Sequence, residues 1–298
     1  YIGLFFILML LMVMVLYGFY LILLVFLNVS KILIYDIDYY YNVLNTILEG
    51  PILERKYPEW KQIEIDKHGI NDLAYTLQEI TMEKIKEYVY PLKTSDNLCL
   101  AGGVAYNGYC NEMFTEKWDN VFVPPAIGDE GQATGAYQPA DYTINNNVHK
   151  SNVYAGKSYD YYKGAEKLTS YKEVAQAIAD GKIVGWFQGK SESGNRALGN
   201  RSILADVRNP DIKDIINSTI KMREDFRPFA PAVLEEHYKQ YFETNQPSPY
   251  MSRICKVKPE MKEVIPGVTH VDGTARIQTV NKNDNSKFYE LIREFGEI

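Results

Sequence analysis

Hydrophobic and polar positions are unevenly distributed along the chain. Residues 1–30 carry no charged side chain, and Lys31 is the first charge after them. About 20 apolar residues suffice for a helix to cross a bilayer, so this stretch is long enough for a membrane helix. Three interpretations of residues 1–34 compete: a membrane anchor, a buried core segment, and a translation artefact such as a shifted reading frame. The stretch lacks the basic leader of a signal peptide. The chain begins at Tyr1 rather than Met, as expected of a fragment or a processed product.

Beyond residue 70, short apolar runs alternate with helical patterns. Apolar residues spaced three or four apart predict an amphipathic helix over 71–89. Similar patterns predict further helices over 104–114, 171–180 and 211–220, and strands over 97–101, 121–123 and 183–187. Strands that alternate with helices indicate the α/β class.

The composition is that of an ordinary globular protein. Hydrophobic residues make up 46% and charged residues 23%, which excludes global disorder. A length of 298 residues favours two domains, with one large domain as the alternative. The polar stretch 138–165 is the best candidate for the crossing between them. The net charge of -6 argues against a broad nucleic-acid-binding face. The 3 cysteines are too few for a disulfide framework and fit buried thiols of a cytosolic protein.

Glycines mark two candidate ligand-binding turns. Gly102 and Gly103 follow a predicted strand, where bare backbone N–H groups can approach an anion. A plain turn between a strand and a helix is the alternative. Asp129, held between two glycines, can hold a divalent metal or simply cap the next helix. None of the 4 histidines lies near it in the sequence, so a metal would lack local partners.

Arginines gather in three segments, at 194–204, 221–231 and 270–276. The planar guanidinium group matches the oxygens of phosphate and carboxylate. Any one such segment is typical of a solvated charged face. Three of them, each mixed with Gly, Pro or apolar residues, fit a convergent pocket for a small phosphorylated ligand better.

Five motifs occur in a fixed order: LCLAGGVAYN (98–107), FVPPAIGDEG (122–131), ESGNRALGNRSILAD (192–206), KMREDFRPFAP (221–231) and THVDGTARIQTV (269–280). In this order they resemble the carbamoyltransferase family of nodulation and antibiotic-biosynthesis enzymes. The resemblance covers residues from about 90 to 298. It implies part of an actin-like (ASKHA) ATPase domain at 35–150, similar to the tRNA threonylcarbamoyl transferases, and an incomplete YrdC-like α/β domain at 151–298.

The resemblance implies an ATP-dependent O-carbamoyltransferase. The YrdC-like domain would use ATP and carbamoyl phosphate to form carbamoyl adenylate, and the actin-like domain would pass the carbamoyl group to an acceptor hydroxyl. The expected partner is a small hydroxyl-bearing molecule and not a nucleic acid. The expected location is cytoplasmic, with anchoring through residues 1–30 as the alternative.

The resemblance also implies roles for single residues. It makes Arg196, Lys221, Arg227 and Arg276 the catalytic set that binds the phosphates and the carbamoyl group. Seven further residues would bind the cofactor: Gly102, Gly103 and Asn107 at the nucleotide, and Arg201, Ser202, His270 and Asp272 around the C-terminal pocket. Asp129 would be a metal ligand, with iron as the expected metal and magnesium accompanying ATP.

The chain departs from the family pattern in three places. The usual Glu-Phe-Gly-Pro-Arg reads Glu192-Ser193-Gly194-Asn195-Arg196. The family's metal-binding and acceptor-binding histidines have no counterpart, and a further Asn/Ser motif is missing after Ile298. We therefore expect an incomplete copy, truncated at both ends, that transfers carbamoyl groups poorly alone, and the artefact interpretation of residues 1–34 ranks above the anchor. A tRNA threonylcarbamoyladenosine-type enzyme and an inactive, membrane-tethered nucleotide-binding relic are the alternatives.

Overall fold

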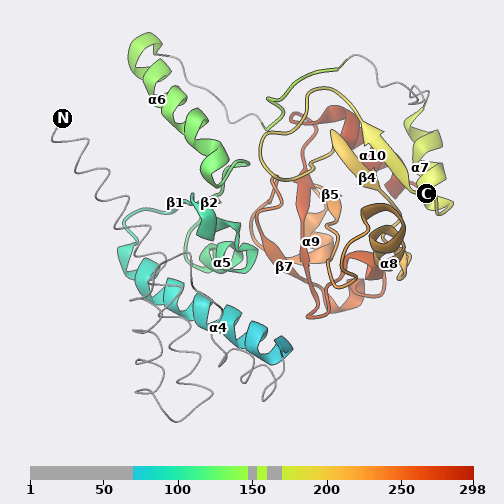
Figure 1. Cartoon of the computed structure of the whole chain (residues 1–298), viewed down its shortest axis with the longest axis horizontal. Coiled ribbons are helices and arrows are strands. Elements are labelled where there is room, and N and C mark those ends of the chain that lie inside the picture. Colours follow the sequence, from blue (N-terminus) through green and yellow to red (C-terminus); the bar gives the residue numbers. More distant parts are fainter. Residues whose placement is uncertain (1–69, 147–152, 160–169) are drawn as a thin grey trace, which may run out of the picture. The chain divides into compact units, whose positions relative to one another are not determined.

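The computed structural model describes residues 70–146, 153–159 and 170–298 (Figure 1). The chain divides into two compact units, Tyr1–Lys93 and Thr94–Ile298. The apolar stretch 1–34 lies outside the described residues, so its three interpretations stay predictions. No helix within the described ranges is long and apolar enough to cross a bilayer.

In the first unit, helix α4 (Ile70–Val89) is followed by a 3-10 turn at Tyr90–Leu92. Ile85 is buried while Lys86 and Glu87 are exposed. This confirms the amphipathic helix predicted over 71–89. Pro91 explains the end of α4, because a proline ring clashes with the preceding turn of an α-helix.

The second unit begins with two short parallel strands, β1 (Asn97–Cys99) and β2 (Asn120–Phe122). The single helix predicted over 104–114 is wrong, because a 3-10 helix (Gly103–Tyr106) and helix α5 (Gly108–Met113) replace it. Asn107 separates them with an extended backbone, and its Oδ1 accepts a 3.2 Å hydrogen bond from Cys110 N. Asparagine favours such caps because its side chain satisfies a free N–H at the helix start.

A 3-10 turn at Asp129–Gly131 leads into helix α6 (Gln132–Asn145). The linker predicted from residue 138 is therefore wrong for its first eight residues, which are helical. The helix ends at Asn146, which adopts the left-handed conformation with φ 54. Residues 147–152 and 160–169 of the predicted linker lie outside the described residues.

The rest of the second unit is built from short strands and helices. Its strands form a β3–β4 antiparallel pair (Val184–Phe187, Arg201–Leu204), a β5–β9 parallel pair (Ala232–Leu234, Gln278–Val280) and a β6–β7–β8 antiparallel sheet (Phe242–Glu243, Ile254–Val257, Thr274–Arg276). Its α-helices are α7 (Tyr171–Ala179), α8 (Ile212–Ile216), α9 (Tyr238–Tyr241) and α10 (Ser286–Gly296). A π-helix (Asn217–Lys221) continues α8, and 3-10 turns occur at Phe114–Glu116, Pro259–Met261 and Pro266–Val268.

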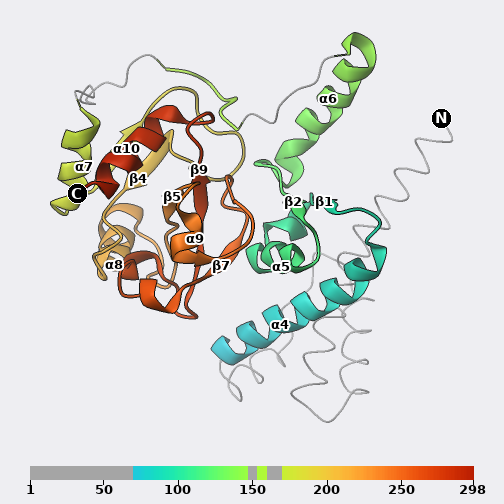
Figure 2. The same ribbon diagram turned by 180° about the vertical axis from the view of Figure 1, so that it is seen from behind.

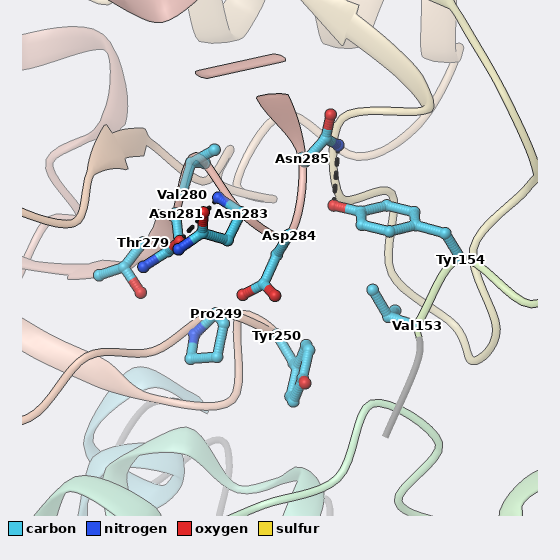
Figure 3. Close-up of a pocket in the computed structure, with 10 residues that line it drawn as sticks. All are labelled: Val153, Tyr154, Pro249, Tyr250, Thr279, Val280, Asn281, Asn283, Asp284 and Asn285. Carbon is cyan, nitrogen blue, oxygen red and sulfur yellow. Dashed lines mark hydrogen bonds between the residues drawn. The ribbon is translucent and has the colours of Figure 1, made fainter. Parts of the chain in front are cut away.

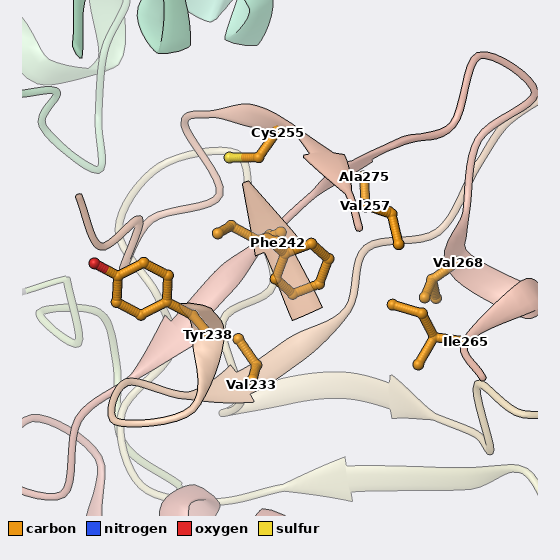
Figure 4. Packing of buried hydrophobic residues seen from close by; sticks show 9 residues of the cluster. Val233, Tyr238, Phe242, Cys255, Val257, Ile265, Val268 and Ala275 are labelled. Carbon is orange, nitrogen blue, oxygen red and sulfur yellow. The ribbon is translucent and has the colours of Figure 1, made fainter. Parts of the chain in front are cut away.

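One hydrophobic cluster fills the space around the three-stranded sheet (Figure 4). Along β7, Cys255 and Val257 are buried while Lys256 is exposed, the alternation expected of a strand with one face on the core. Phe242 and Ala275 from the neighbouring strands join them. This core holds β8 in place, and β8 ends at Arg276.

A second cluster joins α7 and α10, which lie side by side in both views (Figures 1 and 2). Phe288 of α10 packs with Ala175 of α7 and Trp186 of β3. Asn285 caps α10 by accepting a 3.2 Å hydrogen bond from Phe288 N. Gly199 has φ +100, and a Cβ there would lie 2.3 Å from Phe288 Cδ1. Only glycine therefore allows the loop before β4 to pass so close to α10.

The described residues form a mixed α/β protein, as the sequence predicts. The helices over 171–180 and 211–220 are found nearly in place, and so are the three predicted strands. The domain division expected near residue 150 stays a prediction.

Candidate active site

Arginines from two other segments lie near Arg276 at the end of β8. Burial, together with the positive charges of Arg196, Arg223 and Arg227, lowers the pKa of Arg276 to about 10. Burial also lowers the pKa of Arg196. We call these four residues the arginine cluster. It contains three of the four residues expected to be catalytic, and it adds Arg223.

The arginine cluster holds more positive charge than its surroundings neutralise. Arg227 Nη1 lies 3.6 Å from Glu224 Oε2, and both side chains are largely exposed. Within the described residues, neither Arg196 nor Arg276 forms an ion pair with a carboxylate, and Arg276 Nε is buried without a hydrogen-bond partner. Gathered like charges and an unpaired buried donor are both unfavourable. An anionic ligand would relieve both.

Asn217 of the π-helix positions the cations of the 221–231 segment. Its side chain is only 1% exposed. Its Oδ1 accepts a 2.7 Å hydrogen bond from Arg223 Nε, and its Nδ2 donates a 2.9 Å hydrogen bond to Arg227 O. The Arg223 guanidinium lies 4.6 Å from the ring centre of Phe229. The sequence motifs assign a role to neither Asn217 nor Arg223. Arg223 could have been found from its place in the KMREDFRPFAP motif, between Lys221 and Arg227.

Lys221 is exposed at the end of the π-helix. Among the described cations it is not one of those that act on the pKa of Arg276. Its catalytic role stays a prediction.

Glu192 holds the loop that carries Arg196. Its Oε1 accepts hydrogen bonds from the backbone N–H groups of Leu198, Asn200 and Arg201, at 2.7, 2.8 and 3.1 Å. Gly194 adopts φ +98, and a Cβ there would lie 2.3 Å from Pro125 O. Glu192, Gly194 and Arg196 are the residues that this loop geometry uses. They are also the three positions at which the segment agrees with the usual Glu-Phe-Gly-Pro-Arg.

Arg201 and Ser202 lie in the β3–β4 hairpin. Arg201 donates hydrogen bonds of 2.5 Å to Gln188 O and 2.9 Å to Gly189 O, and it stacks 3.7 Å from the ring centre of Phe187. Ser202 Oγ accepts a 3.0 Å hydrogen bond from Gly199 N. Both side chains brace the hairpin, and their binding role stays a prediction.

The glycine turn at Gly102 and Gly103 is followed by Tyr106, which lies near Arg196 of the arginine cluster. Gly102 N donates a 2.8 Å hydrogen bond to Ile127 O, and Gly102 and Gly103 are both exposed with open space around them. The Tyr106 hydroxyl donates a hydrogen bond to Glu130, which raises the tyrosine pKa, while the nearby charge of Arg196 lowers it. Tyr106 is a site residue that the sequence analysis did not assign. Asn107 caps α5, as described above.

Asp129 does not form a metal site with its described neighbours. It is exposed, and its Oδ1 accepts a 2.8 Å hydrogen bond from Gln132 Nε2. The adjacent carboxylate of Glu130 is engaged by Tyr106 and by Gly128 N. Across the described ranges, no three His, Cys, Asp or Glu side chains are grouped to hold a metal ion. The donors present therefore do not fit iron, and the metal role of Asp129 stays a prediction.

His270 and Asp272 belong to a hydrogen-bonded relay next to the arginine cluster. Thr274 Oγ1 donates a 2.7 Å hydrogen bond to Asp272 Oδ1, and His270 Nδ1 lies 3.0 Å from the same Thr274 Oγ1. Because the threonine proton points at Asp272, the network assigns the histidine proton to Nδ1. His270 Nε2 then keeps its lone pair and is buried without a hydrogen-bond partner in the described part of the chain. Burial lowers the pKa of His270. The negative charge of Asp272 raises this pKa, and the positive charge of Arg276 lowers it. The ring is therefore neutral at pH 7.

An incompletely neutralised arginine cluster in a mixed α/β protein is suited to the oxygens of phosphate or carboxylate groups. Two family models match the chain: the carbamoyltransferase N-terminus over residues 36–137 and the carbamoyltransferase C-terminus over residues 175–298. The chain therefore belongs to the carbamoyltransferase family, as its five motifs predict.

Similar proteins include nodulation protein NolNO of Sinorhizobium fredii, which is 36% identical over 278 residues covering 83% of this chain and 40% of the relative. Nodulation protein NolO of Bradyrhizobium diazoefficiens is 38% identical over 220 residues covering 66% of this chain and 40% of the relative. An uncharacterized protein of Synechocystis is 36% identical over 277 residues covering 76% of this chain and 45% of the relative. The chain spans less than half the length of these relatives.

Proposed function

We propose that the chain acts in ATP-dependent O-carbamoyl transfer. ATP, carbamoyl phosphate and water would give carbamoyl adenylate, phosphate and pyrophosphate. The carbamoyl group would then pass to an acceptor hydroxyl, and AMP would leave. The observation that carries the proposal is the gathering of four arginines from three segments, one of which, Arg276, has a buried Nε with no hydrogen-bond partner among the described residues.

The arginine cluster supports this chemistry through its charge. Both substrates are polyanions, and both steps of adenylate formation release a phosphate-bearing leaving group. Guanidinium groups fixed in a partly buried site stabilise such charge better than water does, because they need no reorganisation. Asn217 and Glu192 support the proposal by fixing Arg223 and the Arg196 loop before any ligand arrives.

His270 supplies a proton acceptor in an otherwise cationic site. Its Nε2 lone pair can accept a hydrogen bond from the carbamoyl NH2 or from the water that attacks carbamoyl phosphate. Burial, with a smaller contribution from the charge of Arg276, lowers the pKa of the ring, so the lone pair stays available at pH 7. Asp272 and Thr274 orient the ring through Nδ1.

We infer an actin-like fold for the N-terminal family region and a YrdC-like fold for the C-terminal one, which the mixed α/β structure supports. A small hydroxyl-bearing acceptor and a cytoplasmic location remain part of the proposal. The net charge of -6 supports an acceptor other than a nucleic acid. No step is assigned to a metal.

The proposal is tested with the purified full chain by pyrophosphate release from ATP. We expect release that depends on carbamoyl phosphate and is lost in Arg276→Ala, with Arg293→Ala on the exposed face of α10 as the matched control. Release that requires threonine and bicarbonate instead would identify a threonylcarbamoyladenosine-type enzyme. A melting temperature unchanged by ATP and by carbamoyl phosphate would favour the inactive relic.

A further inference from the structure

A cavity of about 300 Å³ lies beside β9 and the start of α10 (Figure 3). Its walls come from residues 153–154, 249–250 and 279–285, and the sequence motifs assign a role to none of them. The volume is at the lower end of the range of small-molecule sites. Among the lining residues Asp284 alone carries a charge. The cavity therefore has the opposite electrostatic character to the arginine cluster.

Two asparagines form the rigid frame of the cavity. Asn285 Nδ2 donates hydrogen bonds of 2.9 Å to Tyr154 Oη and 3.0 Å to Asn200 Oδ1. Its Oδ1 accepts from Gln188 Nε2 at 3.0 Å and also caps α10. Asn281 Oδ1 accepts a 2.9 Å hydrogen bond from Asn283 N. These two side-chain amides hold the wall in place, and their hydrogen bonds are made within the protein.

One charged group of the lining has no such commitment. The Asp284 carboxylate projects into the space near Tyr154 and Tyr250 (Figure 3). Within the described residues it has no hydrogen-bond or ion-pair partner.

The cavity has a negative potential and aromatic walls. The pKa of Tyr154 is raised to about 12, first by burial and then by the charges of Glu192 and Asp284 and by Tyr250. Both observations favour a cation: the carboxylate attracts it directly, and the faces of two tyrosine rings attract it through their π electrons.

We propose that this cavity binds a small organic cation with a primary ammonium group. The ammonium donates to the Asp284 carboxylate, while the carbon skeleton packs against Tyr154 and Tyr250. A phosphate-bearing ligand is disfavoured because the lining offers a carboxylate and no cation. A bare metal ion would leave most of the 300 Å³ and the aromatic walls uncovered. This binding is independent of the proposed carbamoyl transfer.

The proposal is tested with three probes of one shape and different charge: benzylammonium, benzyl alcohol and benzoate. Their affinities for the full chain are measured by saturation-transfer-difference NMR titration. We expect benzylammonium to bind more tightly than benzyl alcohol. Any binding of benzoate belongs to the arginine cluster and should be unaffected by Asp284→Asn. Equal binding of the alcohol and the ammonium would overturn the proposal, and so would an absence of binding by the ammonium.

Variants place the binding at this cavity. Asp284→Asn keeps the shape and removes the charge, and we expect it to weaken benzylammonium about threefold to fivefold. The control is Asp119→Asn, an exposed aspartate outside the cavity. Equal weakening by Asp119→Asn would show a general charge effect and would also overturn the proposal.

Discussion

Tyr109 Oη donates a 2.6 Å hydrogen bond to Asp272 Oδ2 across 163 residues of chain. The bond joins α5, in the region matched by the N-terminal family model, to the turn before β8, in the region matched by the C-terminal one. Burial and Asp272 together raise the pKa of Tyr109 to about 12. Asp272 is the carboxylate that orients Thr274 and, through it, His270. The relay beside the arginine cluster is thus anchored from both family regions.

Removing the Tyr109 hydroxyl is expected to destabilise the chain. Tyr109→Phe keeps the ring and deletes a hydrogen bond to a charged group, which is worth about 1.5–3 kcal/mol. The measurement is the free energy of unfolding in urea. Tyr142→Phe, an exposed ring on α6, is the control and should change it by less than about 0.5 kcal/mol. Equal effects of the two variants would show that the bond to Asp272 does not stabilise the protein.

His270 is expected to make the stability fall in mild acid. Its folded pKa lies below the unfolded value of about 6.5. Between these two pKa values the unfolded chain binds the proton and the folded chain does not, so the stability falls as the pH drops below about 6.5. The slope contributed by this group is at most about 1.4 kcal/mol per pH unit. His270→Asn, which keeps a donor near Nδ1, should flatten the difference measured by urea unfolding between pH 7.5 and 5.5. An unchanged pH dependence would show that another group titrates.

Local patterns predicted the elements well where one physical signal dominates. The amphipathic period of α4 and the apolar run of β3 each give an element close to its predicted bounds. The prediction failed where a side chain competes with the backbone. Asn107 caps α5 and divides the helix expected over 104–114, and apolar periodicity does not record such a cap.

The sequence predicted the charged residues of the site, but it did not predict the residues that hold them in position. Arg196, Arg227 and Arg276 were singled out because arginine in glycine-rich and proline-rich segments suggests an anion site, and the structure brings these three together. Arg201 has the same local setting, yet its guanidinium is used by backbone carbonyls of the hairpin. Tyr106 acts through contacts distant in the sequence. Asn217 acts through hydrogen bonds to Arg223 and Arg227, and this spacing belongs to no helical or strand period.

Neutralising Arg276 should separate folding from anion binding. In the free protein this guanidinium is repelled by three others and carries an unpaired Nε, so Arg276→Met should leave the stability unchanged or raise it. The same variant should lose the gain in melting temperature that ATP or carbamoyl phosphate gives the parent chain. For a ligand at about 100 times its Kd, that gain corresponds to about 2.7 kcal/mol. Thermal unfolding with and without each ligand measures both effects. A variant that melts lower and still responds to ligand would contradict the assignment.

Gly199 should be the least replaceable residue of the loop between β3 and β4. Its φ of +100 strains any other residue, and a Cβ would lie 2.3 Å from the Phe288 ring, which is itself buried between α7 and β3. Left-handed strain alone costs about 1–3 kcal/mol, and moving Phe288 adds to it, so Gly199→Ala should lower the free energy of unfolding by at least about 2 kcal/mol. Gly185→Ala in β3 is the matched control, because nothing lies within 4 Å of its added Cβ. The Arg196 loop is bonded to the same segment through Glu192, so Gly199→Ala should also weaken the binding of ATP, which calorimetric titration measures. A Gly199→Ala chain as stable as Gly185→Ala would mean that the loop does not pass against α10 in solution.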